Sequence, residues 1–201
     1  MKRIILYAAA VAVALGLCVS ARAQDNGPFH ITEFSATMVM SVPGHNATNT
    51  MKIYRSGDKM RSELSQMGTQ AYSLSLLSEH IGYFVMRPGM CIETHQSNPN
   101  HPNPFGMTGK VQRTELGTDT VDGHPTKIEQ ITIESGTGKT VSMKTWTATD
   151  LHGFPLRIEM PMAQGTARME FKDVSLSSPP ASLFDPPSNC RQMPVMPGGP
   201  H

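Results

Sequence analysis

Residues 34–42 read FSATMVMSV, and apolar side chains occupy every second position of this stretch. Because successive side chains of a β-strand point to opposite faces, the alternation predicts a half-buried strand. The apolar parity comprises Phe34, Ala36, Met38, Met40 and Val42. The Pro-Gly pair at residues 43–44 is typical of a turn, so the strand is expected to end there.

The segment KIYRSGDKMRSEL, residues 52–64, predicts a β-hairpin. Ser56, Gly57 and Asp58 provide a turn between two segments that both favour extended backbone. After the turn, Met60 and Leu64 share one parity, and the charged side chains between them share the other. We therefore expect two antiparallel strands with one apolar face.

Comparable segments recur along the chain, with turn residues between them. We expect further strands at residues 71–77, 81–87, 111–116, 126–134, 140–149, 154–162 and 166–176. A Pro- and Gly-rich loop is expected over residues 97–109 and one helical turn over 181–184. No window shows the apolar spacing of an amphipathic helix. The sequence thus predicts an all-β domain with little helix.

The N-terminus has the pattern of an export signal. Lys2 and Arg3 precede an apolar run over residues 4–19, and Ala21 and Ala23 fit a cleavage site before Gln24. The run is short for a membrane-spanning helix, and Leu17 before Cys18 disfavours lipid attachment. We expect a signal peptide over 1–23, one β domain over 24–190, and a disordered tail rich in Pro, Gly and Met over 191–201. The mature protein is expected to be periplasmic or secreted, and soluble.

Signal cleavage also changes the charge and the cysteine count. It removes three basic residues, which leaves 14 against 16 acidic ones and a net charge of −2. Basic residues are scattered, so no nucleic-acid partner is expected. Cys91 and Cys190 remain, and an even number in an exported chain favours a disulfide, with two free thiols or a metal pair as alternatives.

Four segments together resemble the DUF4412 family of exported bacterial proteins, which is itself similar to the LolA/LolB lipoprotein-carrier superfamily. They are KIYRSGDKMRSEL at 52–64, GTDTVDGHPTK at 117–127, WTATDLHGFP at 146–155 and PASLFDPP at 180–187. The resemblance extends over residues 34–189. It implies a strongly curved antiparallel sheet, an incomplete barrel with an apolar concave face. In the carriers, helices cover that face and the pocket holds acyl chains. The long amphipathic first helix and the lid helix have no counterpart in this sequence, and no carrier functional residue matches by motif.

Methionine is the strongest chemical peculiarity of the chain, since 14 of its 15 methionines follow the signal peptide. Their flexible, polarizable side chains suit an adaptable apolar surface, and they equally suit the core of a sheet. The two interpretations overlap, because the core and the pocket of a half-barrel share one face. The predicted ligand-binding residues on the concave face are Phe34, Met38, Met40, Met51, Ile53, Met60, Met143, Leu156, Ile158, Met160, Met169 and Phe171.

These patterns favour a non-enzymatic binding protein of the cell envelope, because none of the common catalytic motifs occurs. The expected ligand is lipophilic, an acyl chain or a lipid-modified protein, and no cofactor is expected. One alternative is a protein-interaction module of the envelope. Another is a copper-binding protein, since thioether and imidazole groups suit copper. Its ligands would be His95, His101, Met193, Met196 and His201.

Overall fold

The computed structural model describes residues 28–44, 48–64, 71–87, 89–95, 104–135, 138–188 and 190–192. Six strands precede the long loop: β1 (Glu33–Ser41), β2 (Asn49–Ser56), β3 (Lys59–Leu64), β4 (Tyr72–Leu76), β5 (Ile81–Arg87) and β6 (Met90–His95). The elements after it are β7 (Lys110–Val121), β8 (His124–Glu134), β9 (Thr140–Ala148), β10 (Phe154–Met162), β11 (Gly165–Ser175), the 3-10 turn η2 (Ala181–Phe184) and β12 (Arg191–Gln192).

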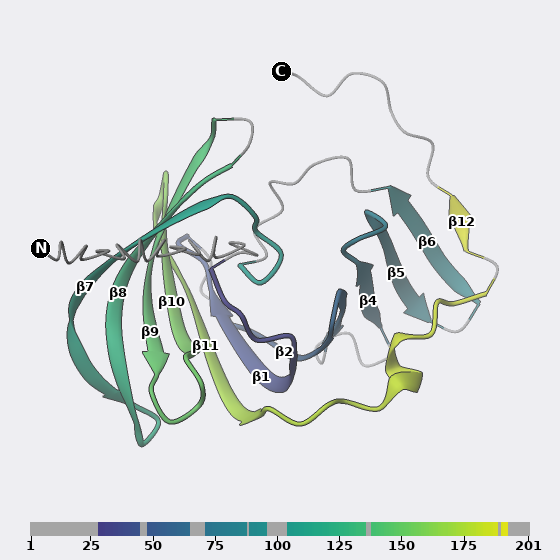
Figure 1. Cartoon of the computed structure of the whole chain (residues 1–201). Helices are drawn as coiled ribbons and strands as arrows, with labels where there is room; N and C mark the ends of the chain where they lie inside the picture. Colours follow the sequence, from purple (N-terminus) through teal and green to yellow (C-terminus); the bar gives the residue numbers. More distant parts are fainter. Residues whose placement is uncertain are drawn as a thin grey trace, which may run out of the picture.

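All of these strands belong to one sheet, in the order β12-β6-β5-β4-β3-β2-β1-β11-β10-β9-β8-β7. Neighbouring strands are antiparallel, except that β12 is parallel to β6. Strand β1 pairs with both β2 and β11, so it joins two meanders into one surface. Figure 1 shows this surface curving round on itself, with β7 and β12 at its two ends. The predicted all-β class and strongly curved antiparallel sheet are confirmed.

The alternation that opens the sequence is reproduced in the burial of β1. Phe34, Ala36 and Met38 are buried, whereas the residues between them are half-buried. The hairpin turn predicted after Ser56 is also present, because Ser56 pairs with Lys59 and Gly57 has a positive φ of 59°. Local side-chain pattern and turn residues therefore determine this part of the sheet.

Two hydrophobic clusters lie on opposite faces of the sheet. The larger one includes Phe34, Met38, Ile53 and Met60, whose side chains define what we call the inner face. The smaller one comprises buried Leu74, Leu76 and Phe184. Met60 is paired with Ser75, so Leu74 and Leu76, one residue to either side, point to the other face. We call that other side the outer face.

The segment after β11, residues 176–192, crosses to the outer face, where Figure 1 shows it running beside β4, β5 and β6. We call it the strap. Phe184 is 2% exposed against Leu74 and Leu76, and the Nη1 of Arg61 donates a hydrogen bond to the carbonyl of Leu183 at 3.1 Å. These contacts attach the middle of the strap to the sheet.

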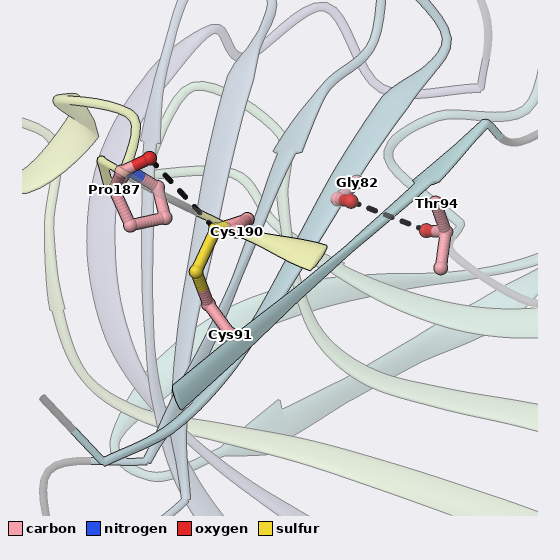
Figure 2. Close-up of a disulfide and its surroundings, with 5 residues drawn as sticks. All are labelled: Gly82, Cys91, Thr94, Pro187 and Cys190. Carbon is pink, nitrogen blue, oxygen red and sulfur yellow. Dashed lines mark hydrogen bonds between the residues drawn. A yellow bond between two sulfur atoms is a disulfide. The ribbon is translucent and has the colours of Figure 1, made fainter. Parts of the chain in front are cut away.

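The end of the strap is attached covalently by the predicted disulfide between Cys91 of β6 and Cys190, with 4.7 Å between their Cα atoms. Figure 2 shows Cys190 beside Pro187, whose carbonyl oxygen lies 3.8 Å from the Cys190 sulfur. The disulfide rules out the alternatives of free thiols and a metal pair. Two residues that we assigned to the disordered tail, Arg191 and Gln192, instead pair with β6. Residues 193–201 lie outside the described residues.

Two further differences concern strand length and number. Strand β7 runs on to Val121, beyond the predicted end at Leu116, because a bulge between Glu115 and Gly117 breaks the alternation without ending the pairing. Strand β6 was not predicted at all. The expected signal peptide lies outside the described residues. Within the described ranges, no helix has the length and apolar character needed to cross a membrane.

The outer face of β9, β10 and β11 is charged. Arg168 lies 2.7 Å from Glu159, and Arg157 lies 3.1 Å from Glu170. Lys144 and Arg157 both lie over the ring of Trp146, at 4.7 and 5.1 Å from its centroid. An apolar ligand would find no matching surface there, so the inner face is the better candidate for binding one.

Candidate binding face

The structure brings all twelve predicted ligand-binding residues into the larger hydrophobic cluster. Strand pairing explains this grouping, since Met38 lies opposite both Met51 and Phe171, and Met169 lies opposite both Met40 and Ile158. Nine of the twelve are buried: Phe34, Met38, Ile53, Met60, Met143, Leu156, Ile158, Met169 and Phe171. The other three, Met40, Met51 and Met160, are half-buried at the border of the cluster.

A short irregular segment covers the buried part of this face. Phe105 is 5% exposed, and its ring lies 4.9 Å from Phe34, 5.4 Å from Phe29, 5.6 Å from Phe171 and 6.0 Å from Phe154. In Figure 1 the chain before β7 passes on the concave side of the sheet. Sequence reasoning assigned this segment to an open loop. The sequence feature that could have indicated burial of this segment is the presence of a Phe and a Met among Pro and Gly at residues 104–107.

Arg55 fastens this segment to the sheet. It lies on the inner face opposite Phe34 and Met60, is 8% exposed, and donates from Nη1 to the carbonyl of Phe105 at 3.1 Å. Its Nε donates to the carbonyl of Gly57, also at 3.1 Å. Burial lowers the pKa of the Arg55 guanidinium, while the negative charges of Glu33 and Asp58 raise it. A guanidinium remains a cation at neutral pH, so these carbonyls accept charge-assisted hydrogen bonds.

Glu33 supports the same corner of the molecule. Its Oε1 accepts hydrogen bonds from Ser56 Oγ at 3.2 Å and from the Gly57 amide at 3.0 Å. Its Oε2 is buried and has no hydrogen-bond partner in the described part of the chain. The carboxylate therefore orients the β2–β3 turn next to Arg55.

A second polar group on the inner face lies near β7. Arg113 Nη1 is 3.3 Å from Glu129 Oε2, which also accepts a hydrogen bond from Thr147 Oγ1 at 3.0 Å. Arg113 donates as well to the carbonyl of Pro28, at the start of the described chain. Each charge has a partner, so this group joins β7, β8 and β9 and offers no unpaired charge to a ligand.

The inner face continues over β3, β4, β5 and β6 with a different composition. Strand register places Ile53, Ser62, Ser73, Phe84 and Ile92 in one row across five strands. Small side chains occupy the middle of the row. Phe84 and Ile92 are half-buried, and within the described residues neither packs against the two hydrophobic clusters. This part of the face combines apolar side chains with partial exposure.

The copper hypothesis involves residues that the structure places only in part. His95 is at the exposed end of β6, with 51% of its side chain exposed and its Nε2 3.6 Å from Glu93 Oε1. Within the described residues, no three His, Cys, Asp or Glu side chains lie close enough to hold a metal ion. The other four candidate ligands lie outside the described residues: His101, Met193, Met196 and His201.

The family resemblance was tested against family models and against solved structures. Residues 129–190 match DUF4412, a domain of unknown function. This match covers the second half of β8, strands β9, β10 and β11, and most of the strap, and it confirms the resemblance drawn from the sequence. No curated protein matches the sequence.

Several solved structures resemble this chain. An uncharacterized conserved protein from Thermus thermophilus is 11% identical with a TM-score of 0.52, over 82% of this chain and 91% of that one. MucB is 14% identical with a TM-score of 0.55, over 84% of this chain and 61% of MucB. This chain therefore spans less than two thirds of the length of MucB. A complex of MucA and MucB from Pseudomonas aeruginosa has also been solved. The LolA superfamily protein NE2245 from Nitrosomonas europaea is 11% identical with a TM-score of 0.42, over 81% and 94%. The first two matches show a shared fold.

Proposed function

We propose that this protein is a non-enzymatic binding protein of the cell envelope that takes a lipophilic ligand, an acyl chain or a lipid-modified protein, on the inner face. The main support is the half-buried apolar border of that face. Met40, Met51 and Met160 adjoin the packed cluster. Half-buried Phe84 and Ile92 lie on the same face over β5 and β6, beyond Ser62 and Ser73. The buried remainder acts as the rigid support of this border.

The chemistry of the border suits a ligand of variable shape. Methionine side chains have three rotatable bonds and a polarizable sulfur, so they can repack around different apolar groups. The small side chains of Ser62 and Ser73 lie between Ile53 and Phe84 on the inner face. A binding site of this kind is mostly apolar with a few polar groups.

The proposed compartment is the periplasm or the extracellular space, with the mature chain soluble there. The disulfide between Cys91 and Cys190 supports it, because such bonds persist in oxidising compartments. The expected signal peptide over residues 1–23 gives independent support. Mass spectrometry of protein recovered from the periplasm tests this directly, since cleavage should leave Gln24 at the N-terminus.

Ligand binding can be tested with the full chain exported and purified. We expect co-purified lipid in an organic extract and enhanced fluorescence of a lipophilic naphthylamine dye. Met51→Glu and Phe84→Glu should each weaken dye binding at least tenfold, because they place a charge on the inner face. Thr50→Glu introduces the same charge on the outer face of β2 and should leave binding unchanged. Protein that carries no lipid and binds no dye would disprove the proposal.

A protein partner is a second candidate, and the similarity to MucB favours it because MucB has been solved in complex with MucA. In this case the inner-face border would contact a segment of another envelope protein. Cross-linking in intact cells should then give one defined adduct, which Met51→Glu removes and Thr50→Glu preserves. Dye binding would be absent.

A further inference from the structure

The methionines of this sheet differ widely in exposure. Met90 and Met162 are exposed, at 39% and 52%. Met40, Met51 and Met160 are half-buried at the border of the inner face. The buried group includes Met38, Met60, Met143 and Met169, each at 8% or less. Oxidants reach thioether sulfurs in this order of exposure, so the three groups should differ in reactivity.

The half-buried group at the border has a special position on the sheet. Met51 lies directly opposite buried Met38, and Met40 lies directly opposite buried Met169. Met160 belongs to β10, two strands away from β1, and lies on the same face. It is paired with Ala167 of β11. These three side chains are therefore partly exposed at the point where the packed core ends and the proposed binding surface begins.

We propose that Met40, Met51 and Met160 are oxidation sites that regulate this surface, an inference that rests on the proposed function of lipophilic binding. A hydroperoxide transfers one oxygen atom to a thioether sulfur. The sulfur loses two electrons, the O–O bond breaks as the S–O bond forms, and with hydrogen peroxide the second oxygen leaves as water. The product is a sulfoxide.

A sulfoxide is polar where the thioether was apolar, so it changes the property on which binding depends. Three sulfoxides at the border would place strong dipoles where an acyl chain is expected to lie, and burying them without hydrogen-bond partners is unfavourable. The buried methionines beneath should keep the sheet intact, because peroxide reaches them only when the core opens. Oxidation therefore removes ligand affinity and preserves the fold. A methionine sulfoxide reductase reverses it with a dithiol as reductant: the dithiol gives up two electrons and becomes a disulfide, and the sulfoxide oxygen leaves as water.

The test treats the purified full chain with hydrogen peroxide in a time course. Peptide mass spectrometry follows sulfoxide at each methionine, and titration with the naphthylamine dye follows affinity. We expect the border methionines to oxidise at least tenfold faster than Met143 and Met169. Dye affinity should fall at least tenfold as they do so, and methionine sulfoxide reductase should restore it.

Two variants separate the border from the exposed sulfurs. Met40→Leu/Met51→Leu/Met160→Leu should keep its dye affinity after peroxide, whereas Met90→Leu/Met162→Leu should lose it as the unsubstituted chain does. The inference is overturned if the border methionines react no faster than Met143, or if the triple variant remains peroxide-sensitive. If untreated protein binds no dye, the proposed function fails, and the order of oxidation rates still decides whether these sulfurs are selective modification sites.

Discussion

Phe105 shows how much a single side chain contributes to this fold. It comes from an irregular segment, yet its ring contacts four other Phe rings, one at the start of the described residues and the others in β1, β10 and β11. Aromatic pairs at these distances add to the free energy gained by burial. Arg55 holds the backbone of Phe105 through a hydrogen bond to its carbonyl. The inner face is therefore a packed core in one part and a half-exposed surface in another.

Removing the ring at this position should destabilise the whole domain. Phe105→Ala deletes a side chain that is 5% exposed, and such substitutions cost about 3–5 kcal/mol. Urea unfolding followed by the fluorescence of Trp146, the only tryptophan of the chain, measures the loss. Leu116→Ala is the control, because Leu116 is 53% exposed and should cost about 0.5 kcal/mol or less. Equal effects of the two substitutions would show that Phe105 does not belong to the core.

Asp150 gives a pH-dependent prediction at the same scale. The hydrogen bond from the His124 side chain, 2.8 Å away, lowers the pKa of Asp150 below its ordinary value. Its stabilising contribution is therefore fully present above the unfolded-state pKa of about 3.9 and is lost as the pH falls through the folded-state pKa. The contribution is small, since the carboxylate is exposed to solvent.

The measurement compares the urea midpoints of the unsubstituted chain and of Asp150→Asn. We expect the substituted protein to be less stable at pH 6 and the difference to close as the pH falls below the unfolded-state pKa and through the lowered folded-state pKa of Asp150. Asp185→Asn, at another exposed carboxylate, should show no comparable trend. A difference that widens on acidification would refute the assignment of this hydrogen bond.

At the scale of elements, the alternating strands were predictable and the long-range contacts were not. Strands β1 and β3 follow their apolar parity, because each needs only one face buried. The bulge after Glu115 hid the second half of β7. Strand β12 follows Cys190, whose disulfide partner Cys91 lies 99 residues earlier. The position of Phe105 likewise depends on a contact with Arg55, 50 residues earlier. The sequence therefore predicted which residues share the candidate face. It did not predict which of them are buried in the core and which lie at the half-buried border.

The strap yields a prediction for one element. The disulfide closes a loop of about 100 residues, and removing it should cost about 5 kcal/mol on the chain-entropy model. Cys91→Ser/Cys190→Ser should therefore shift the urea midpoint strongly. A dithiol reductant should lower the stability of the unsubstituted chain to that of the double variant and leave the variant itself unchanged. A midpoint that responds to neither treatment would mean that the noncovalent contacts of Phe184 suffice to hold the strap.

At the scale of the whole molecule, the sheet combines two unequal cores. The inner cluster buries side chains from β1, β2, β3 and β7 to β11 together with Phe105. Strands β4, β5 and β6 depend on the outer cluster, in which Leu74, Leu76 and Phe184 are buried, and on the covalently attached strap. Their hydrogen-bonded connection to the strands of the larger core is the ladder between β3 and β4. We infer that this end of the sheet opens at lower free energy than the rest.

Native-state hydrogen exchange measured by peptide mass spectrometry can detect this difference. In the oxidised protein we expect amides of β4, β5 and β6 to exchange faster than those of β8, β9 and β10, since the smaller core opens without global unfolding. Reduction of Cys91–Cys190 should accelerate exchange at β4, β5 and β6 at least tenfold further, because it releases the end of the strap from β6. The side chains of β8, β9 and β10 belong to the inner cluster, so the amides of these strands provide the internal control. Equal protection along the whole sheet before and after reduction would show that the two cores unfold as one unit.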